Sequence, residues 1–261
     1  MLTHKNLITN TDQCLKAISV SAKDIFICLL PMFHSFALTT CVLIPLRKGA
    51  SIVINETLLP FEPVLKSIWK NKVSVFVAVP QVYSALCNKV QGAKALLLRL
   101  LNPIRVCISG AAPLPKSVHT RFEKSFGVPL LEGYGLTETS PVVTLNPEKK
   151  RRFGTVGLPL PGVQVSIRKD DATEGRPNEV GEIWIRGENV MAGYYKKPKE
   201  TEAVLTKDGW LKSGDLGKAD KEGYITIVDR KKDLIIVKGL NVYPQEIEAV
   251  LLEHPQIKEA A

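Results

Sequence analysis

Hydrophobic and polar positions alternate in two different ways along the chain, with the change near residue 150. In the first part, short apolar runs are typical of buried strands, and segments with apolar residues at helical spacing lie between them. The expected strands are 26–30, 73–79 and 104–109, and the expected helices are 3–18, with Thr3 as N-cap, 61–71, 81–88 and 115–126. Strands that alternate with helices favour an α/β fold, in which helices cover a mostly parallel sheet.

After residue 150 the expected strands are short and alternating, and Gly- and Pro-rich turns separate them. These strands are 163–168, 180–186 and 224–228, which predicts a small, largely antiparallel, barrel-like β-subdomain. A charged break at 229–233 precedes a strand at 234–237 and a helix that Pro244 opens at its first turn. We therefore expect three regions: 1–150, 151–229, and 230–261, the last being the start of a further domain.

One stretch is long enough to cross a bilayer. Residues 25–46 contain no Asp, Glu, Lys or Arg. Pro31, His34 and Pro45 interrupt this stretch, so a buried strand, a turn and a buried helix are the preferred interpretation. The polar N-terminal sequence MLTHKNL is not that of a signal peptide.

Composition is that of an ordinary globular protein: 261 residues, 45% hydrophobic and 23% charged. The net charge of +9 permits an anionic partner. The basic run 149–152 contains no aromatic residue and accompanies no nucleic-acid-binding motif, so we expect no nucleic-acid partner. Five cysteines without a CxxC pair argue against a zinc site or a disulfide framework and favour buried free thiols in a reducing compartment.

The segment 131–141, LEGYGLTETSP, is the most informative for chemistry. Its glycines allow backbone to approach a flat ring, and Tyr134 can lie against that ring. The Thr137 hydroxyl can donate to a phosphate, and the Glu138 carboxylate can hold Mg²⁺. A tight turn with a core tyrosine and a surface glutamate is the alternative.

Two other segments suit a ligand in the same way. Ser109, Gly110 and Ala111 follow an expected strand, where small residues let a ligand reach the strand's carboxyl end. Further on, Asp215 and Arg230 could hold ribose hydroxyls. An ordinary turn, and a surface turn with a solvated charge run, are the respective alternatives.

Four motifs that occur in a particular order along the chain favour the ligand-binding interpretation over ordinary turns. They are PMFHSFALTT at 31–40, YGLTETSP at 134–141, GWLKSGD at 209–215 and DRKKDLIIVKGLNVYPQEIE at 229–248. Together they resemble the adenylate-forming superfamily of acyl-CoA synthetases, luciferases and peptide-synthetase adenylation domains. The resemblance extends over essentially the whole chain and is strongest to long-chain fatty-acid CoA ligases. Under it, 1–150 is part of the N-terminal domain and 230–261 is a hinge with the beginning of a C-terminal α+β lid domain.

The resemblance implies a role for particular residues. The implied adenine pocket consists of Gly110, Ala111, Glu132, Gly133 and Tyr134, with Tyr134 stacked on the base. Thr137 is implied as a phosphate contact and Glu138 as the Mg²⁺ ligand.

It also implies roles for residues outside that pocket. Asp215 binds the ribose hydroxyls with help from Arg230, and His34 lies at the mouth of the acyl pocket. Lys232 is the implied hinge, and Lys238 the implied lid residue that faces the site during thioester formation.

The implied reaction activates a long-chain fatty acid with ATP and Mg²⁺ to an acyl-adenylate, which then passes to CoA. Family members carry a phosphate loop before a segment like MLTHKNL and a catalytic lysine near the end of the lid. We therefore expect the chain to be incomplete at both ends and inactive alone. The expected location is cytoplasmic, with peripheral membrane contact left open. Two alternatives remain: a non-catalytic adenylate-binding remnant, and an acyl-AMP ligase or adenylation domain that loads a carrier protein.

Overall fold

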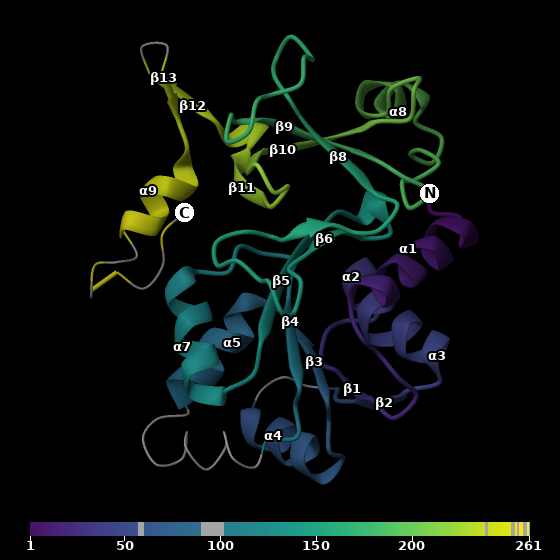
Figure 1. The fold of residues 1–261 in the computed structure, drawn as a ribbon, viewed down its shortest axis with the longest axis vertical. Coiled ribbons are helices and arrows are strands. Elements are labelled where there is room, and N and C mark those ends of the chain that lie inside the picture. Colours follow the sequence, from purple (N-terminus) through teal and green to yellow (C-terminus); the bar gives the residue numbers. More distant parts are fainter. Residues whose placement is uncertain are drawn as a thin grey trace. The chain divides into compact units, whose positions relative to one another are not determined.

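The structure, a computed structural model, describes residues 1–56, 60–89, 102–237, 240–251, 254, 256–257 and 260 (Figure 1). It divides into two compact units. Unit 1 contains Met1–Gly162 and Glu188–Ala192, and unit 2 contains Val163–Gly187 and Gly193–Ala261. Each unit is described by itself.

Unit 1 is built on one sheet, whose strands in the described part of the chain follow the order β2-β1-β3-β4-β5-β6-β7. The first five strands in this order run parallel, and β6 and β7 are added antiparallel. The bounds are β1 Ile25–Cys28, β2 Ser51–Ile54, β3 Val75–Ala78, β4 Val106–Ser109, β5 Leu130–Gly135, β6 Val142–Leu145 and β7 Leu158–Pro159. The α/β prediction with a mostly parallel sheet is confirmed.

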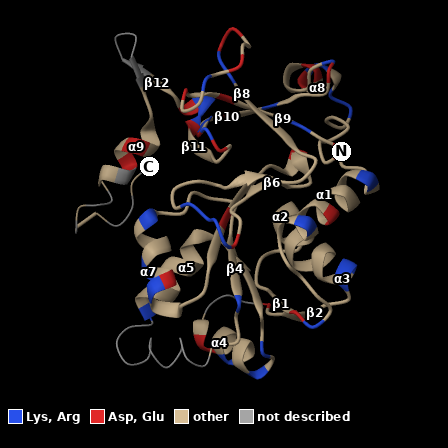
Figure 2. Cartoon of the chain, viewed as in Figure 1, with Lys and Arg blue, Asp and Glu red and all other residues tan. Residues whose placement is uncertain are grey.

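Helices lie on both faces of this sheet (Figure 1). Its described strands contain no charged residue apart from Glu132, whereas the helices around it carry Lys and Arg (Figure 2). On one side are α4 Phe61–Lys70, α5 Pro80–Lys89 and α7 Lys116–Phe126, and on the other are α1 His4–Ala17, α2 Ser35–Ala37, the π-helical turn η1 Leu38–Leu43 and α3 Ile44–Lys48. Helix α1 begins where the sequence predicts. The Thr3 hydroxyl accepts the Asn6 N–H at 3.1 Å, and the Asn6 side chain accepts the Thr3 N–H at 2.8 Å.

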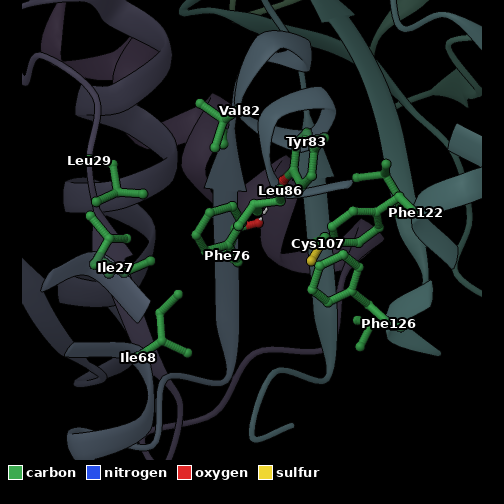
Figure 3. Close-up of a cluster of buried hydrophobic side chains, with 14 of the residues drawn as sticks. Ile27, Leu29, Ile68, Phe76, Val82, Tyr83, Leu86, Cys107, Phe122 and Phe126 are labelled. Carbon is green, nitrogen blue, oxygen red and sulfur yellow. Dashed lines mark hydrogen bonds between the residues drawn. The ribbon is translucent and has the colours of Figure 1, made fainter. Parts of the chain in front are cut away.

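The core under α4, α5 and α7 is aromatic and aliphatic (Figure 3). Tyr83 lies at its centre with its ring edge-on to Phe76 and Phe122. The buried Tyr83 hydroxyl donates to the backbone carbonyls of Phe76 at 3.1 Å and Ile108 at 2.8 Å. Helix α5 is therefore hydrogen-bonded to both β3 and β4 through the side chain of Tyr83.

Unit 2 contains a separate antiparallel sheet of order β11-β10-β9-β8. Its strands are β8 Gln164–Arg168, β9 Gly181–Arg186, β10 Leu211–Ala219 and β11 Ile225–Arg230. The other elements are α8 Pro198–Val204, the short turn η3 Lys231–Asp233, the hairpin β12 Ile235–Val237 with β13 Leu240–Val242, and α9 Pro244–Leu251. The separate antiparallel sheet is confirmed, whereas the strands β10 and β13 and the helix α8 were not anticipated.

The uncharged stretch 25–46 folds as strand β1 followed by α2, η1 and α3. In the part of the chain that the structure describes, no helix is both long enough and apolar enough to cross a bilayer. All five cysteines are free and buried, as predicted.

Candidate functional site

A cavity of about 270 Å³ opens in unit 1 beside the carboxyl ends of the parallel strands β4 and β5. That edge is where open α/β sheets bind ligands. Loops after both strands contribute to the wall, together with α1, α2, the π-helical turn and β6. The lining residues include His34, Ser35, Phe36, Gly110, Ala111, Gly133, Tyr134, Thr137 and Glu138.

Seven of the predicted site residues meet in this cavity. They come from three segments far apart in sequence: His34, Gly110 with Ala111, and Gly133, Tyr134, Thr137 and Glu138. Glu132 lies immediately before them in β5 and is buried. The residues expected to form an adenine pocket and a phosphate contact are therefore neighbours in space.

Close contacts explain why two of these positions are glycine. A Cβ on Gly110 would lie 3.0 Å from the Phe36 ring, so this position must be small for the ring to line the cavity. A Cβ on Gly135 would lie 1.9 Å from the Pro141 carbonyl oxygen, where β5 turns back into β6. Sequence reasoning anticipated small residues at these positions but missed Phe36, whose apolar run gave no sign of the contact.

The turn that carries Thr137 and Glu138 is held at several points. Within it, the Thr139 hydroxyl accepts the Leu136 N–H at 3.0 Å and donates to the Pro141 carbonyl at 2.6 Å. The buried Asn189 side chain donates to the Thr139 carbonyl at 2.9 Å. A rigid turn fixes where its hydroxyl and carboxylate can reach.

Helix α1 holds the neighbouring strand through a buried amide. The Asn10 side chain donates to the Val142 carbonyl at 2.6 Å and accepts the Val142 N–H at 3.0 Å. One turn earlier, Asn6 donates to the backbone carbonyls of Glu188 and Val190. Two asparagines four residues apart in the predicted helix were the signal that could have revealed this role, since that spacing places both on one face.

Two side chains at the cavity mouth come from the segment before η1. His34 is exposed, and its Nδ1 accepts the Phe36 N–H at 3.2 Å. The Ser35 hydroxyl lies 3.1 Å from the Thr137 hydroxyl. Ser35 is a site residue that sequence reasoning missed.

Glu132 is the perturbed acid beside the cavity. It is 6% exposed, and its carboxylate accepts the Leu114 N–H at 3.2 Å. Burial raises the pKa of this carboxyl to about 7, although the hydrogen bond from Leu114 favours the ionised form. The contact ties the loop after β4 to strand β5, which form two walls of the cavity.

In unit 2, Asp215 and Arg230 are paired across β10 and β11. The Arg230 Nε lies 3.9 Å from the Asp215 carboxylate, and the Asp215 N–H donates to the Ser213 hydroxyl at 3.0 Å. Lys232 is exposed in the turn η3. Lys238 lies outside the described residues. The structure thus brings Asp215 and Arg230 together, and the roles inferred for these four residues stay predictions.

Comparison with known proteins decides what this architecture represents. Residues 1–195 match the family of AMP-binding enzymes. The chain belongs to this family. Long-chain-fatty-acid–CoA ligases of Bacillus subtilis and Yersinia pestis are 39% and 37% identical to it over 99% and 100% of its length. The chain spans about half the length of these relatives, 46% in both cases.

Solved structures of AMP-binding enzymes have the same fold. ATP-bound MatB from Rhodopseudomonas palustris superposes with a TM-score of 0.91 at 32% identity, over 99% of this chain and 50% of that protein. The o-succinylbenzoate CoA synthetase of Bacillus subtilis, in complex with its acyl-adenylate intermediate, gives a TM-score of 0.90 at 30% identity over 100% of this chain and 52% of that one. The predicted resemblance to adenylate-forming enzymes is confirmed.

The residues present fit a magnesium ion that binds together with a nucleotide. Mg²⁺ is usually held by one or two carboxylates plus substrate phosphates. Within the described ranges no cluster of three or more metal-ligating side chains exists. Glu138, a half-buried carboxylate in the cavity wall, is the donor type that a nucleotide-bound Mg²⁺ needs.

Proposed function

We propose that this chain is part of an AMP-forming acyl-CoA synthetase that activates a fatty acid with ATP and passes the acyl group to CoA. The observation that carries the proposal is the cavity in unit 1, where Gly110, Tyr134, Thr137 and Glu138 line one space. The names of the two ligases that this chain resembles support the substrate class, and the ATP-bound neighbour supports the nucleotide. We further propose a cytoplasmic location, with any membrane contact peripheral.

The chemistry explains why these side chains are needed. A carboxylate is a poor electrophile because its leaving group would be oxide. Attack of the fatty-acid oxygen on the α-phosphorus of ATP forms a P–O bond, breaks the bond to the β-phosphate and releases pyrophosphate. The CoA thiolate then attacks the acyl carbon and displaces AMP.

The residues that line the cavity each have a defined task in these two reaction steps. Tyr134 provides a face for adenine, and Gly110 and Gly133 keep the walls flat beside it. Thr137 donates a hydrogen bond to a phosphate oxygen, which counters the charge that develops in the transition state. Glu138 would hold Mg²⁺, which offsets the repulsion between the two anions when bound.

The rest of the lining suits an apolar group. The same space is lined by Cys14 of α1, Ile18 directly after that helix, Ile44 of α3, and Val142 and Leu145 of β6. Such a wall favours a hydrocarbon chain over a polar acid. In unit 2, Asp215 with Arg230 is proposed to bind the ribose hydroxyls, Lys232 to act as hinge and Lys238 to face the site during thioester formation.

The test is fatty-acid-dependent pyrophosphate release. This chain is joined in frame to the parts of the Bacillus subtilis ligase that lie outside the matched region, giving a joined polypeptide. We expect that polypeptide to release pyrophosphate only with ATP and palmitate, and to form palmitoyl-CoA when CoA is added. The 261-residue chain alone should bind AMP without turnover.

Other results would contradict the proposal. AMP binding without pyrophosphate release in a folded joined polypeptide indicates an adenylate-binding module. Transfer to carrier phosphopantetheine but not to CoA indicates a carrier-loading enzyme.

A further inference from the structure

Two hydroxyl groups from distant segments meet at the edge of the cavity. Ser35 Oγ lies 3.1 Å from Thr137 Oγ1, although the residues are 102 positions apart. Both line the cavity, Ser35 being half-buried and Thr137 exposed. Ser35 therefore contacts the Thr137 hydroxyl, which is proposed to face the phosphate.

A second hydrogen bond between the same segments keeps this contact in register. The buried Thr39 hydroxyl donates to the Ser140 carbonyl at 3.0 Å. Ser35 and Thr39 are four residues apart, so they lie on one side of their helical segment. Together they hold the two ends of the turn η2 Thr137–Thr139, and the position of Ser35 relative to Thr137 is thereby fixed.

The hydrogen-bonding capacity of a hydroxyl gives this contact a chemical consequence. A hydroxyl has one proton to donate and two lone pairs that accept. When Ser35 donates to Thr137, the Thr137 proton is left for an acceptor in the cavity. A charged phosphate oxygen is a stronger acceptor than water or a carbonyl.

We propose that Ser35 is a positioning residue, which donates to Thr137 Oγ1 and so directs the Thr137 proton toward a nucleotide phosphate. This inference rests on the proposed function, in which Thr137 is the phosphate contact. It predicts a selective effect: loss of the Ser35 hydroxyl weakens the binding of ligands that carry the phosphate and leaves the nucleoside alone unaffected.

The experiment compares AMP and adenosine binding to the 261-residue chain by calorimetry. Ser35→Ala should raise the Kd for AMP about 5- to 10-fold, the usual effect of one lost hydrogen bond, and leave the Kd for adenosine within twofold. Ser35→Thr retains the hydroxyl and should restore AMP binding. Ser117→Ala, at an exposed serine of α7, is the matched control and should change neither Kd.

A double-mutant cycle tests whether Ser35 acts through Thr137. Thr137→Val should weaken AMP binding by at least as much as Ser35→Ala, and the double variant should be no weaker than Thr137→Val. An unchanged AMP affinity in Ser35→Ala, an equal loss of adenosine affinity, or a full Ser35 effect in the Thr137→Val background would overturn the inference while leaving the nucleotide site intact. A wild-type chain that binds neither ligand would contradict the proposed function and this inference together.

Discussion

At the residue scale, environment rather than residue type separates the two glutamates of segment 131–141. Glu138 is half-buried in the cavity wall, whereas Glu132 is buried and accepts one backbone N–H. Both are carboxylates in one short motif. Their surroundings suit Glu138 to a cation and Glu132 to a structural contact between strand β5 and the loop after β4.

Glu132 should make unit 1 less stable as pH rises. Its folded pKa of about 7 lies above the ordinary 4.5, so the folded state binds the extra proton between these values. The contribution of Glu132 to stability is fully present below about pH 4.5, falls through this window and is lost above about pH 7. Glu132→Gln should therefore raise the free energy of unfolding by up to about 3 kcal/mol at pH 8 and by less than about 1 kcal/mol at pH 5, as measured by urea denaturation.

Glu123 provides a comparison of opposite sign. Burial alone would raise its pKa, but the His119 imidazole 3.5 Å away and hydrogen bonds from Arg151 and the Leu130 N–H outweigh burial and lower the pKa to about 2. Glu123→Gln should thus destabilise the protein at neutral pH and have less effect in acid.

A Glu132→Gln variant whose stability gain does not depend on pH would refute the assignment for Glu132.

At the element scale, the buried amides of α1 secure the strand that borders the cavity. Strand β6 follows the turn that carries Thr137 and Glu138, and Asn10 satisfies both backbone groups of Val142. Packing alone would leave these groups without partners in the core. The helix therefore fixes β6 by hydrogen bonding as well as by apolar contact.

Asn10→Leu tests this arrangement. The variant keeps a similar side-chain volume but leaves the buried Val142 N–H and carbonyl without a partner, which should cost about 2–4 kcal/mol of unfolding free energy. Chemical denaturation measures the loss, and AMP affinity reports any movement of β6. Ile8→Ala, at an exposed position of the same helix, should change stability by less than about 0.5 kcal/mol. A loss below 1 kcal/mol for Asn10→Leu would mean that solvent reaches these groups.

At the scale of the whole molecule, the parallel order of the strands assembles the cavity. β4 and β5 are parallel neighbours in the sheet, so the loops that follow residues 109 and 135 begin at the same edge. The segment after β1 reaches that edge as well, since β1 runs parallel to β3 and β3 to β4. Three motifs, whose outer two are about 100 residues apart in the chain, thus become one wall.

Activity of the joined polypeptide provides the test at this scale. Glu138→Ala should reduce Mg²⁺-dependent pyrophosphate release by about 10²–10³-fold, because a group that stabilises transition-state charge is lost. The stability of the variant should stay close to that of wild type. Glu202→Ala, at an exposed glutamate of α8, is the control. Full activity in Glu138→Ala would exclude the proposed role of this carboxylate.

From the sequence alone, local patterns predicted β1, β3 and β4 and the helices α1, α4, α5 and α7 of unit 1, because apolar periodicity and the Thr3 cap are local properties. The same kind of local reasoning predicted which segments suit a nucleotide. The sequence did not indicate β2, β5, β6 and β7 of unit 1, or β10, β13 and α8 of unit 2. Strands β7 and β13 have only two and three residues, too few to show a period.

Which side chains meet depends on the tertiary fold. The Phe36 ring against Gly110, the Ser35 hydroxyl on Thr137 and the Asn10 amide on Val142 each join segments more than 70 residues apart. Local pattern holds no information about such partners, because sheet order and helix packing bring them together. The elevated pKa of Glu132 has the same origin, since burial is a property of the folded molecule.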